Sequence, residues 1–212
     1  MISEEYINNA IEKTLRGESN LTEDVLAIRG FSNGNIRRLI NNLTNTECTY
    51  LEAGVLMGGT FVSSFNEKCT SIGFEDFSQN FQVDFPGYSK EELEENIERN
   101  RDIAKEIYIH YTCFMDSDKN NLPKGIDIFL MDAEHGLQNQ SIALPEAFDN
   151  MADTFVYITD DASWKEVSEG TGVGFKILRN KMHLVKKWEL RGVNEKDDTW
   201  VCGVDIYLIK KK

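Results

Sequence analysis

The sequence of 212 residues has no long hydrophobic run, since none of its apolar stretches approaches the about 20 residues that a membrane-spanning helix needs. Its start, MISEEYINNAIEK, also lacks the basic segment followed by an apolar one that is typical of a signal peptide. We therefore expect a soluble cytoplasmic protein that makes no contact with membranes.

Basic residues are outnumbered, because 23 Lys and Arg stand against 36 Asp and Glu and give a formal net charge of -13. A surplus of negative charge opposes binding to nucleic-acid phosphates or anionic membranes, although a local basic patch would escape such a count. The balance of charge favours a small molecule as the ligand and no nucleic acid as a partner.

Cysteine is sparse and has no spacing typical of zinc sites or redox pairs. Cys48, Cys69, Cys113 and Cys202 lie far apart, without a C-x-x-C pair among them. We interpret all four as small core residues in a reducing compartment.

What the chain does have is an alternation of short apolar runs and helical patterns. The runs that predict strands are residues 48–51, 71–74, 107–111, 126–131 and 155–159. The segments with helical spacing are residues 33–43, 59–66, 90–105 and 136–151, and Pro145 is expected to kink or restart the last of them. Alternation of this kind predicts a doubly wound α/β fold with a mostly parallel sheet.

Both ends of the chain depart from the alternation. Residues 1–32 form a helical lead-in, with a cap expected at Thr22, and residues 33–212 form the α/β domain. At the other end, residues 182–190 and 200–209 both look like strands. The polar stretch between them is too short for a helical crossover, so they are expected to pair as an antiparallel hairpin.

Three glycines follow the first strand in the stretch YLEAGVLMGGT. In open α/β sheets ligands bind beyond the carboxyl ends of the strands, so Gly54, Gly58 and Gly59 mark either a binding site or a turn that needs positive φ. Their spacing, G-x-x-x-G-G, differs from the G-x-G-x-x-G of dinucleotide-binding folds. Glu52 would repel a pyrophosphate at this place but would suit an amine or a sulfonium cation.

A second acid, Glu75, ends the next strand in SIGFED. An acid at this position binds two ribose hydroxyls in related folds, while the simpler interpretation is a solvated acid at a strand end. Taken together, Glu52 and Glu75 indicate a nucleoside that carries a positive charge and lacks phosphate.

The ordered set YLEAGVLMGGTF, SIGFED, IDIFLMDAEH and YITDD resembles the class I S-adenosylmethionine-dependent methyltransferases, particularly the small-molecule O-methyltransferase branch that includes the macrocin-type enzymes. The resemblance spans about residues 33–209. It implies a Rossmann-like methyltransferase fold with a seven-stranded sheet whose last strand is antiparallel, and an enzyme that transfers a methyl group from S-adenosylmethionine to a hydroxyl of a small molecule.

The resemblance also implies roles for single residues. Glu52, Gly54 and Gly58 would line the methionine part of the cofactor, Glu75 would hold the ribose, and Asp116 with Ser117 would lie near the adenine. The same cofactor site is expected to include Gly59, Thr60 and Asp132.

Acids also end the fourth and fifth strands, at Asp132 and at the pair Asp160 and Asp161. Neighbouring parallel strands end close together, so these carboxylates could converge and hold Mg²⁺ or a similar divalent cation. The alternative is that Asp160 and Asp161 only precede a helix, with Ser163 and Glu166 as its capping box.

His135 is a candidate general base, which together with Asp132 would form the catalytic group, but it could also be a metal ligand or a surface residue. The segment AEHG replaces the G-D-H or G-D-x-Y usual in the resembled family, and DNMADTF replaces its Pro-Gly-Gly-like turn. The first departure leaves the base and the metal geometry open.

The loop of residues 76–89 is long and aromatic, which fits either a lid or a packed loop. Aromatic residues that could wall an acceptor pocket are Phe77, Phe81, Phe85, Tyr88 and Trp164. Two other functions stay open: a nucleotide- or dinucleotide-binding oxidoreductase, and a cofactor-binding protein without catalysis. A homodimer through the N-terminal helices is also compatible with the sequence.

Overall fold

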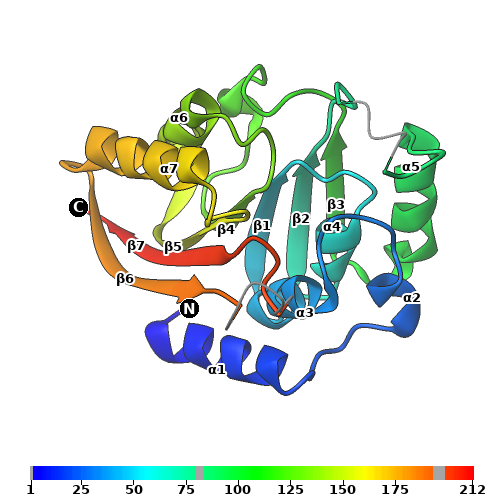
Figure 1. The fold of residues 1–212 in the computed structure, drawn as a ribbon. Helices are drawn as coiled ribbons and strands as arrows, with labels where there is room; N and C mark the ends of the chain where they lie inside the picture. The colour runs from blue at the N-terminus through cyan, green and yellow to red at the C-terminus, as the bar shows by residue number, and fades with distance from the viewer. Residues whose placement is uncertain (1, 80–83, 193–198) are drawn as a thin grey trace.

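The computed structural model describes residues 2–79, 84–192 and 199–212. Its centre is a seven-stranded sheet in the order β3-β2-β1-β4-β5-β7-β6 (Figure 1). The strands are β1 Cys48–Ala53, β2 Cys69–Phe74, β3 Glu106–His110, β4 Ile126–Met131, β5 Met151–Thr159, β6 Met182–Leu190 and β7 Val204–Lys211. The first five strands of the chain are mutually parallel, whereas β7 pairs antiparallel with both β5 and β6. The predicted doubly wound sheet with a terminal hairpin is therefore confirmed.

Helices cover both faces of the sheet (Figure 1). The helices are α1 Glu4–Leu15, α2 Glu23–Leu26, α3 Gly34–Thr44, α4 Gly59–Ser63, α5 Lys90–Arg99, α6 Leu137–Ala147 and α7 Lys165–Leu178. Consecutive strand residues point to opposite faces, so Tyr50 packs with α1, α3, α4 and α5, while Leu51 packs with α6 and α7. The central strands are apolar on both faces because each face is buried.

Polar side chains fix the starts of four helices. Ser3, Thr22, Asn33 and Ser89 each accept a hydrogen bond from a backbone N–H of the first turn that they precede. The predicted cap at Thr22 is thus confirmed. α6 contains Pro145 and continues to Ala147, so the predicted restart at this proline does not occur.

The N-terminal lead-in shares the core of the domain that follows it. Ile7 and Ile11 of α1 are buried in the same cluster as Leu39 of α3. The Tyr6 hydroxyl donates to the carbonyl of Asn42 at 3.0 Å. These contacts fasten α1 against α3, beneath the sheet.

Several predicted boundaries differ from the observed ones. α4 and α5 end earlier than predicted, at Ser63 and Arg99, and a 3-10 turn follows α5. β7 begins at Val204 because residues 199–202 form turns, and most of the predicted polar stretch, residues 193–198, lies outside the described residues. Within the described ranges no helix has both the length and the apolar character required to cross a membrane.

Candidate functional site

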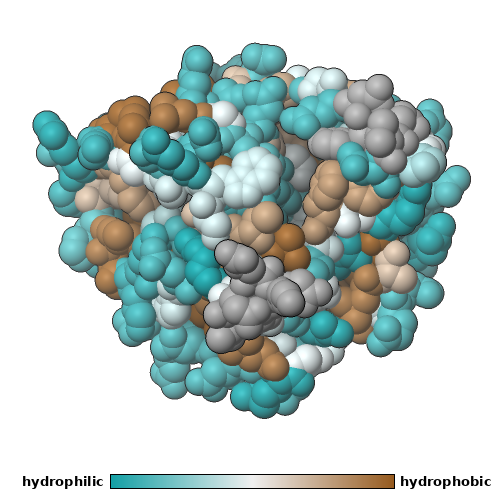
Figure 2. Space-filling view, viewed as in Figure 1, coloured by the Kyte–Doolittle hydropathy of each residue, from teal (hydrophilic) through white to brown (hydrophobic). Residues whose placement is uncertain are grey.

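A cavity of about 500 Å³ opens at the carboxyl ends of the parallel strands. Its walls come from the turn after β1, from the ends of β2, β4 and β5, and from the loops that precede α3 and β7. Figure 2 shows this face of the molecule hollowed near its centre, with apolar residues beside the hollow. A concave, mostly apolar cavity of this size with a few convergent polar groups is typical of a small-molecule site.

The glycine turn after β1 is shaped by a close approach between two loops. Gly54 has φ +91°, and a Cβ placed there would lie 2.3 Å from the carbonyl oxygen of Asp132. Gly58 has φ +92° directly before α4. Gly54, Gly59 and Thr60 line the cavity, whereas Gly58 does not. The turn therefore needs positive φ and borders the site, so both interpretations of the glycines apply.

Glu52 lies beneath this turn and does not reach the cavity, which differs from its predicted place beside the methionine part of a cofactor. Its side chain is fully buried and accepts hydrogen bonds from the hydroxyls of Tyr50 and Thr60, each at 2.5 Å. Burial raises the pKa of Glu52 to about 8. Glu52 contacts the cavity wall through Thr60, which lines the cavity, and its charge also acts on Asp132.

Glu75 lines the cavity from the end of β2 and is held in place by three donors. Its carboxylate accepts hydrogen bonds from the N–H of Leu56 at 2.6 Å, the N–H of Phe77 at 2.9 Å and the hydroxyl of Tyr88 at 3.2 Å. A carboxylate offers about four acceptor sites, so Glu75 keeps capacity for a ligand. It is a fixed side chain and not a freely solvated acid.

The predicted adenine residues do not line the cavity. Asp116 is exposed, and the hydroxyl of Ser117 donates to the carbonyl of Phe114 at 2.8 Å. The wall after β3 is formed instead by Thr112, Cys113 and Phe114. These residues come directly after the strand end, which is the position that the sheet topology itself would have indicated.

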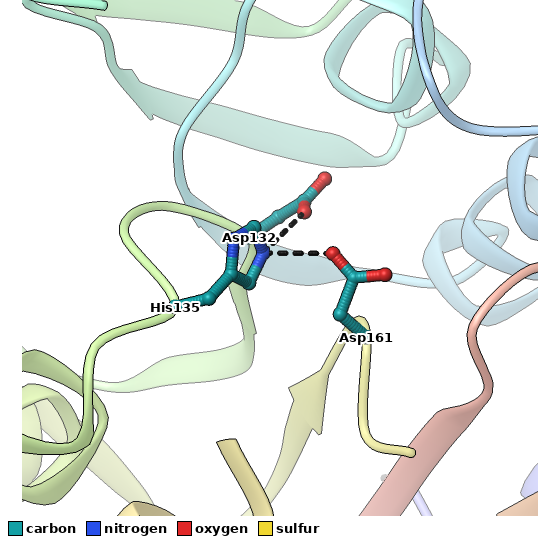
Figure 3. Close-up of side chains that lie close together, drawn as sticks. All are labelled: Asp132, His135 and Asp161. Atoms are coloured by element: carbon teal, nitrogen blue, oxygen red, sulfur yellow. Dashed lines mark ion pairs between the residues drawn. The ribbon is translucent and has the colours of Figure 1, made fainter. Parts of the chain in front are cut away.

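The acids after β4 and β5 converge, together with His135. One ligand atom each from Asp132, His135 and Asp161 lies within 4.8 Å of the other two (Figure 3). His135 Nε2 is 2.9 Å from Asp161 Oδ2 and 4.0 Å from Asp132 Oδ1. The predicted cation site consisted of Asp132, Asp160 and Asp161. The group of converging ligand atoms contains His135 in place of Asp160, which lies nearby in the cavity wall.

The carboxylates in and beside this cluster repel one another. Burial, followed by the repulsion of Asp160 and Glu52, raises the pKa of Asp132 well above its usual value. Asp160 is 8% exposed and its Oδ1 has no hydrogen bond in the described part of the chain. His135 Nε2 also makes no hydrogen bond there, despite its short distance to Asp161. Two carboxylates and an imidazole nitrogen directed at one point fit a divalent cation.

The alternative interpretation as a helix cap is not supported. α7 begins after Trp164 with no side-chain hydrogen bond to its first turn, so Ser163 and Glu166 form no capping box. The loop before α7 is fastened by backbone hydrogen bonds, from Ala162 to Gly203 and from Ser163 to Cys202, each at 2.9 Å. This pairing holds Asp161 in place from the β6–β7 loop.

Aromatic and sulfur side chains complete the walls. Trp164 lines the cavity with its ring 5.0 Å from that of His135, and Phe31 lines it while contacting Phe85. Phe77 and Tyr88 pack together behind the wall, and Phe81 lies outside the described residues.

The expectation that all four cysteines belong to the core was half wrong. Cys48 and Cys69 are buried, but Cys113 and Cys202 line the cavity.

Comparisons with known proteins bear on the fold. No family model and no curated protein matches this sequence. Among solved structures, the O-methyltransferase from Bacillus cereus in complex with S-adenosylhomocysteine is 14% identical, with a TM-score of 0.60 over 99% of this chain and 93% of that chain. TomG, an O-methyltransferase from Streptomyces achromogenes involved in tomaymycin synthesis and solved with S-adenosylmethionine, is also 14% identical, with a TM-score of 0.58 over 99% and 91%.

The chain therefore has the Rossmann-like fold of class I S-adenosylmethionine-dependent methyltransferases, as its sequence motifs predicted. The same fold also occurs in precorrin 8w decarboxylase from Methanobacterium thermoautotrophicum, which is 15% identical, with a TM-score of 0.53 over 87% of this chain and 93% of that chain. Because one fold serves more than one reaction, the activity has to be argued from the site.

Proposed function

We propose that this protein is an S-adenosylmethionine-dependent methyltransferase that methylates a hydroxyl group of a small molecule with the help of a divalent cation. The observation that carries the proposal is the combination, in one cavity, of a fixed carboxylate at the end of β2 and a convergent Asp132–His135–Asp161 cluster at the ends of β4 and β5. Two similar folds were solved with S-adenosylhomocysteine or S-adenosylmethionine bound, which supports this choice of cofactor.

The cofactor would lie across the strand ends. Glu75 would accept hydrogen bonds from the ribose hydroxyls, and the adenine would pack on Cys113 and Phe114 in place of the predicted Asp116 and Ser117. The methionine part would follow the turn at Gly54 and Gly59. This order brings the sulfonium methyl toward the Asp132–His135–Asp161 cluster, where a hydroxyl acceptor would have to be held for transfer.

Asp132, His135 and Asp161 are the residues that would hold the cation, which when bound would lower the pKa of the acceptor hydroxyl. The imidazole ligand favours Mn²⁺ or another first-row transition metal over the predicted Mg²⁺, which prefers oxygen ligands. As a ligand, His135 would have no free Nε2 lone pair for use as a general base. The protein's own part is to position the two reactants and to exclude water from the cavity.

The charges around the cavity restrict the acceptor. Six carboxylates line it, those of Glu75, Asp76, Asp132, Glu134, Asp160 and Asp161. Among the described lining residues Arg29 is the one Lys or Arg, and Glu92 already neutralises it at 2.6 Å. An acceptor with phosphate or carboxylate groups would be repelled, so the proposed acceptor is neutral or cationic and lies beside Trp164 and Phe31.

Calorimetric titration with S-adenosylhomocysteine tests the proposal. Wild-type protein is expected to bind it with micromolar affinity, and Glu75→Ala is expected to remove most of that binding because the ribose loses its acceptor. Glu67→Ala is the control, since Glu67 is exposed and does not line the cavity. Absence of binding to the wild-type protein at millimolar ligand would rule out the methyltransferase proposal.

A further inference from the structure

Arg37 is a buried cation without a carboxylate partner. It belongs to α3 and is 2% exposed. Its guanidinium donates from Nε to the hydroxyl of Ser32 at 3.1 Å, and from Nη1 to the carbonyls of Leu26 at 2.7 Å and Val25 at 3.3 Å. All three acceptors are neutral. In the described ranges no Asp or Glu forms an ion pair with Arg37, and Nη2 has no hydrogen-bond partner.

A buried and unpaired charge is unusual enough to need an explanation. Burial lowers the pKa of Arg37 to about 10, so the side chain stays protonated at neutral pH. Proteins seldom bury a guanidinium without a carboxylate, because desolvation of the charge is costly. The three neutral acceptors explain how the side chain is oriented, but they leave its charge uncompensated.

The free end of Arg37 lies behind two glycines of the cavity wall. A Cβ on Gly59 would be 2.8 Å from Nη2, and a Cβ on Gly30 would be 3.6 Å from it. Gly30 and Gly59 both line the cavity, as do Ser32 and Ile36, which flank Arg37. Nη2 therefore lies close behind these two wall positions, and a side chain at Gly59 would occupy the space next to it.

The proposed cofactor has one anionic group, the carboxylate of its amino-acid end. With the ribose at Glu75 and the sulfonium near Asp132, this end has to continue past Gly59, away from the acids. We propose that Arg37 binds this carboxylate, which enters between Gly30 and Gly59 and supplies the missing counter-charge. The inference rests on the proposed function and adds to it the residue that recognises the amino-acid part of the cofactor.

Two ligands separate this role from a purely structural one. S-Adenosylhomocysteine and 5′-methylthioadenosine share the nucleoside and the sulfur, but only the former has the carboxylate. Wild-type protein is expected to prefer S-adenosylhomocysteine in calorimetry. Arg37→Gln is expected to lower the affinity for S-adenosylhomocysteine about tenfold or more, because a desolvated charge pair is lost. The affinity for 5′-methylthioadenosine should stay unchanged. Arg38→Gln, the next residue of α3, is the matched control and should keep the preference.

Several outcomes would overturn the inference while leaving the proposed function intact. One is an equal loss of both ligands in Arg37→Gln, which would mean a structural role. Another is that Arg29→Gln, and not Arg37→Gln, loses the preference for S-adenosylhomocysteine over 5′-methylthioadenosine. If Arg37→Gln does not fold, the wild-type protein still decides, since decarboxylated S-adenosylmethionine should bind about tenfold more weakly than S-adenosylmethionine. Equal affinity there would contradict the role of Arg37, whereas no binding of any nucleoside would overturn the proposed function itself.

Discussion

Backbone strain in single residues is concentrated at the cavity. Within the described residues, four other than glycine have positive φ: Leu56, Phe77, Asp161 and Cys202. Leu56, Asp161 and Cys202 line the cavity, and Phe77 donates its N–H to Glu75. Such conformations cost of order 1–3 kcal/mol each and persist only where the surroundings enforce them. Their position around one cavity agrees with a site whose side chains are held in place before a ligand binds.

Gly54→Ala tests the close approach of the β1 and β4 loops. The substitution is expected to lower the free energy of unfolding by about 3 kcal/mol or more, because it adds a clash with the Asp132 carbonyl to the strain of positive φ. Gly125→Ala is the control, since Gly125 has φ +83° with no atom within 4 Å of its added Cβ, and should cost about 1 kcal/mol. If urea unfolding shows that Gly54→Ala and Gly125→Ala lose the same free energy of unfolding, the close approach at Gly54 is contradicted.

Asp161→Asn tests the cation site through two effects of opposite sign. It should weaken Mn²⁺ binding at least tenfold, roughly the loss seen for the outer partners of metal sites. It should also raise the melting temperature of the metal-free protein, because one repelling carboxylate is removed. Glu134→Gln, which changes a neighbouring acid outside the cluster, should retain Mn²⁺ binding. Unaltered Mn²⁺ affinity in Asp161→Asn would mean that the cluster holds no cation.

At the scale of single residues, the acids of the cavity could be predicted from the sequence, but not all of their partners could. Glu75, Asp132 and Asp161 end strands, and the topology of a parallel sheet brings strand ends together, so they could be predicted to meet. The role of Arg37 could not be predicted, because its position within a helical pattern does not show that it is buried without a carboxylate partner. The burial of Glu52 was also not predictable, since it depends on the positions of Tyr50 and Thr60.

At the scale of secondary-structure elements, most strands could be predicted and one helix could not. The apolar runs of β1 and β4 are buried on both faces, which makes them easy to recognise. α7 contains the stretch SEGTGVGFK, whose glycines are unfavourable in a helix. The structure shows the reason for two of the three: a Cβ at Gly170 would lie 2.7 Å from the carbonyl oxygen of Leu137, and a Cβ at Gly174 would lie 2.9 Å from that of Ser141. Close packing against α6 overrides the low helix propensity.

Ile7→Ala tests whether α1 belongs to the core of the α/β domain. Ile7 is fully buried, so the substitution should lower the free energy of unfolding by about 2–5 kcal/mol in a single cooperative transition. Leu15→Ala, on the exposed side of the same helix, should change it by less than about 0.5 kcal/mol. A separate transition for α1, or no loss from Ile7→Ala, would indicate that the lead-in folds independently of the sheet.

At the scale of the whole molecule, the fold places buried acids at the carboxyl ends of the strands, and this couples stability to pH. The pKa of Glu52 rises from 4.5 to about 8 on folding because of burial. Between these values the unfolded state has released the proton and the folded state keeps it, so the free energy of unfolding decreases as pH rises and levels off above about pH 8.

Glu52→Gln measures this coupling. The variant keeps the shape of the neutral acid, so its urea unfolding should depend less on pH than that of the wild type. The difference in the free energy of unfolding between the variant and the wild type should change by up to about 1.4 kcal/mol per pH unit between about pH 5 and 8. Parallel profiles over this range would show that Glu52 is ionised in the folded protein.

One calorimetric comparison distinguishes binding of S-adenosylmethionine in the cavity from binding of a dinucleotide. Wild-type protein is titrated with S-adenosylhomocysteine and, separately, with NAD⁺. Micromolar binding of S-adenosylhomocysteine without binding of NAD⁺ is the predicted result, because the six carboxylates of the cavity would repel a pyrophosphate. Binding of NAD⁺ without binding of S-adenosylhomocysteine would rule out the proposed methyltransferase and favour an oxidoreductase on the same sheet.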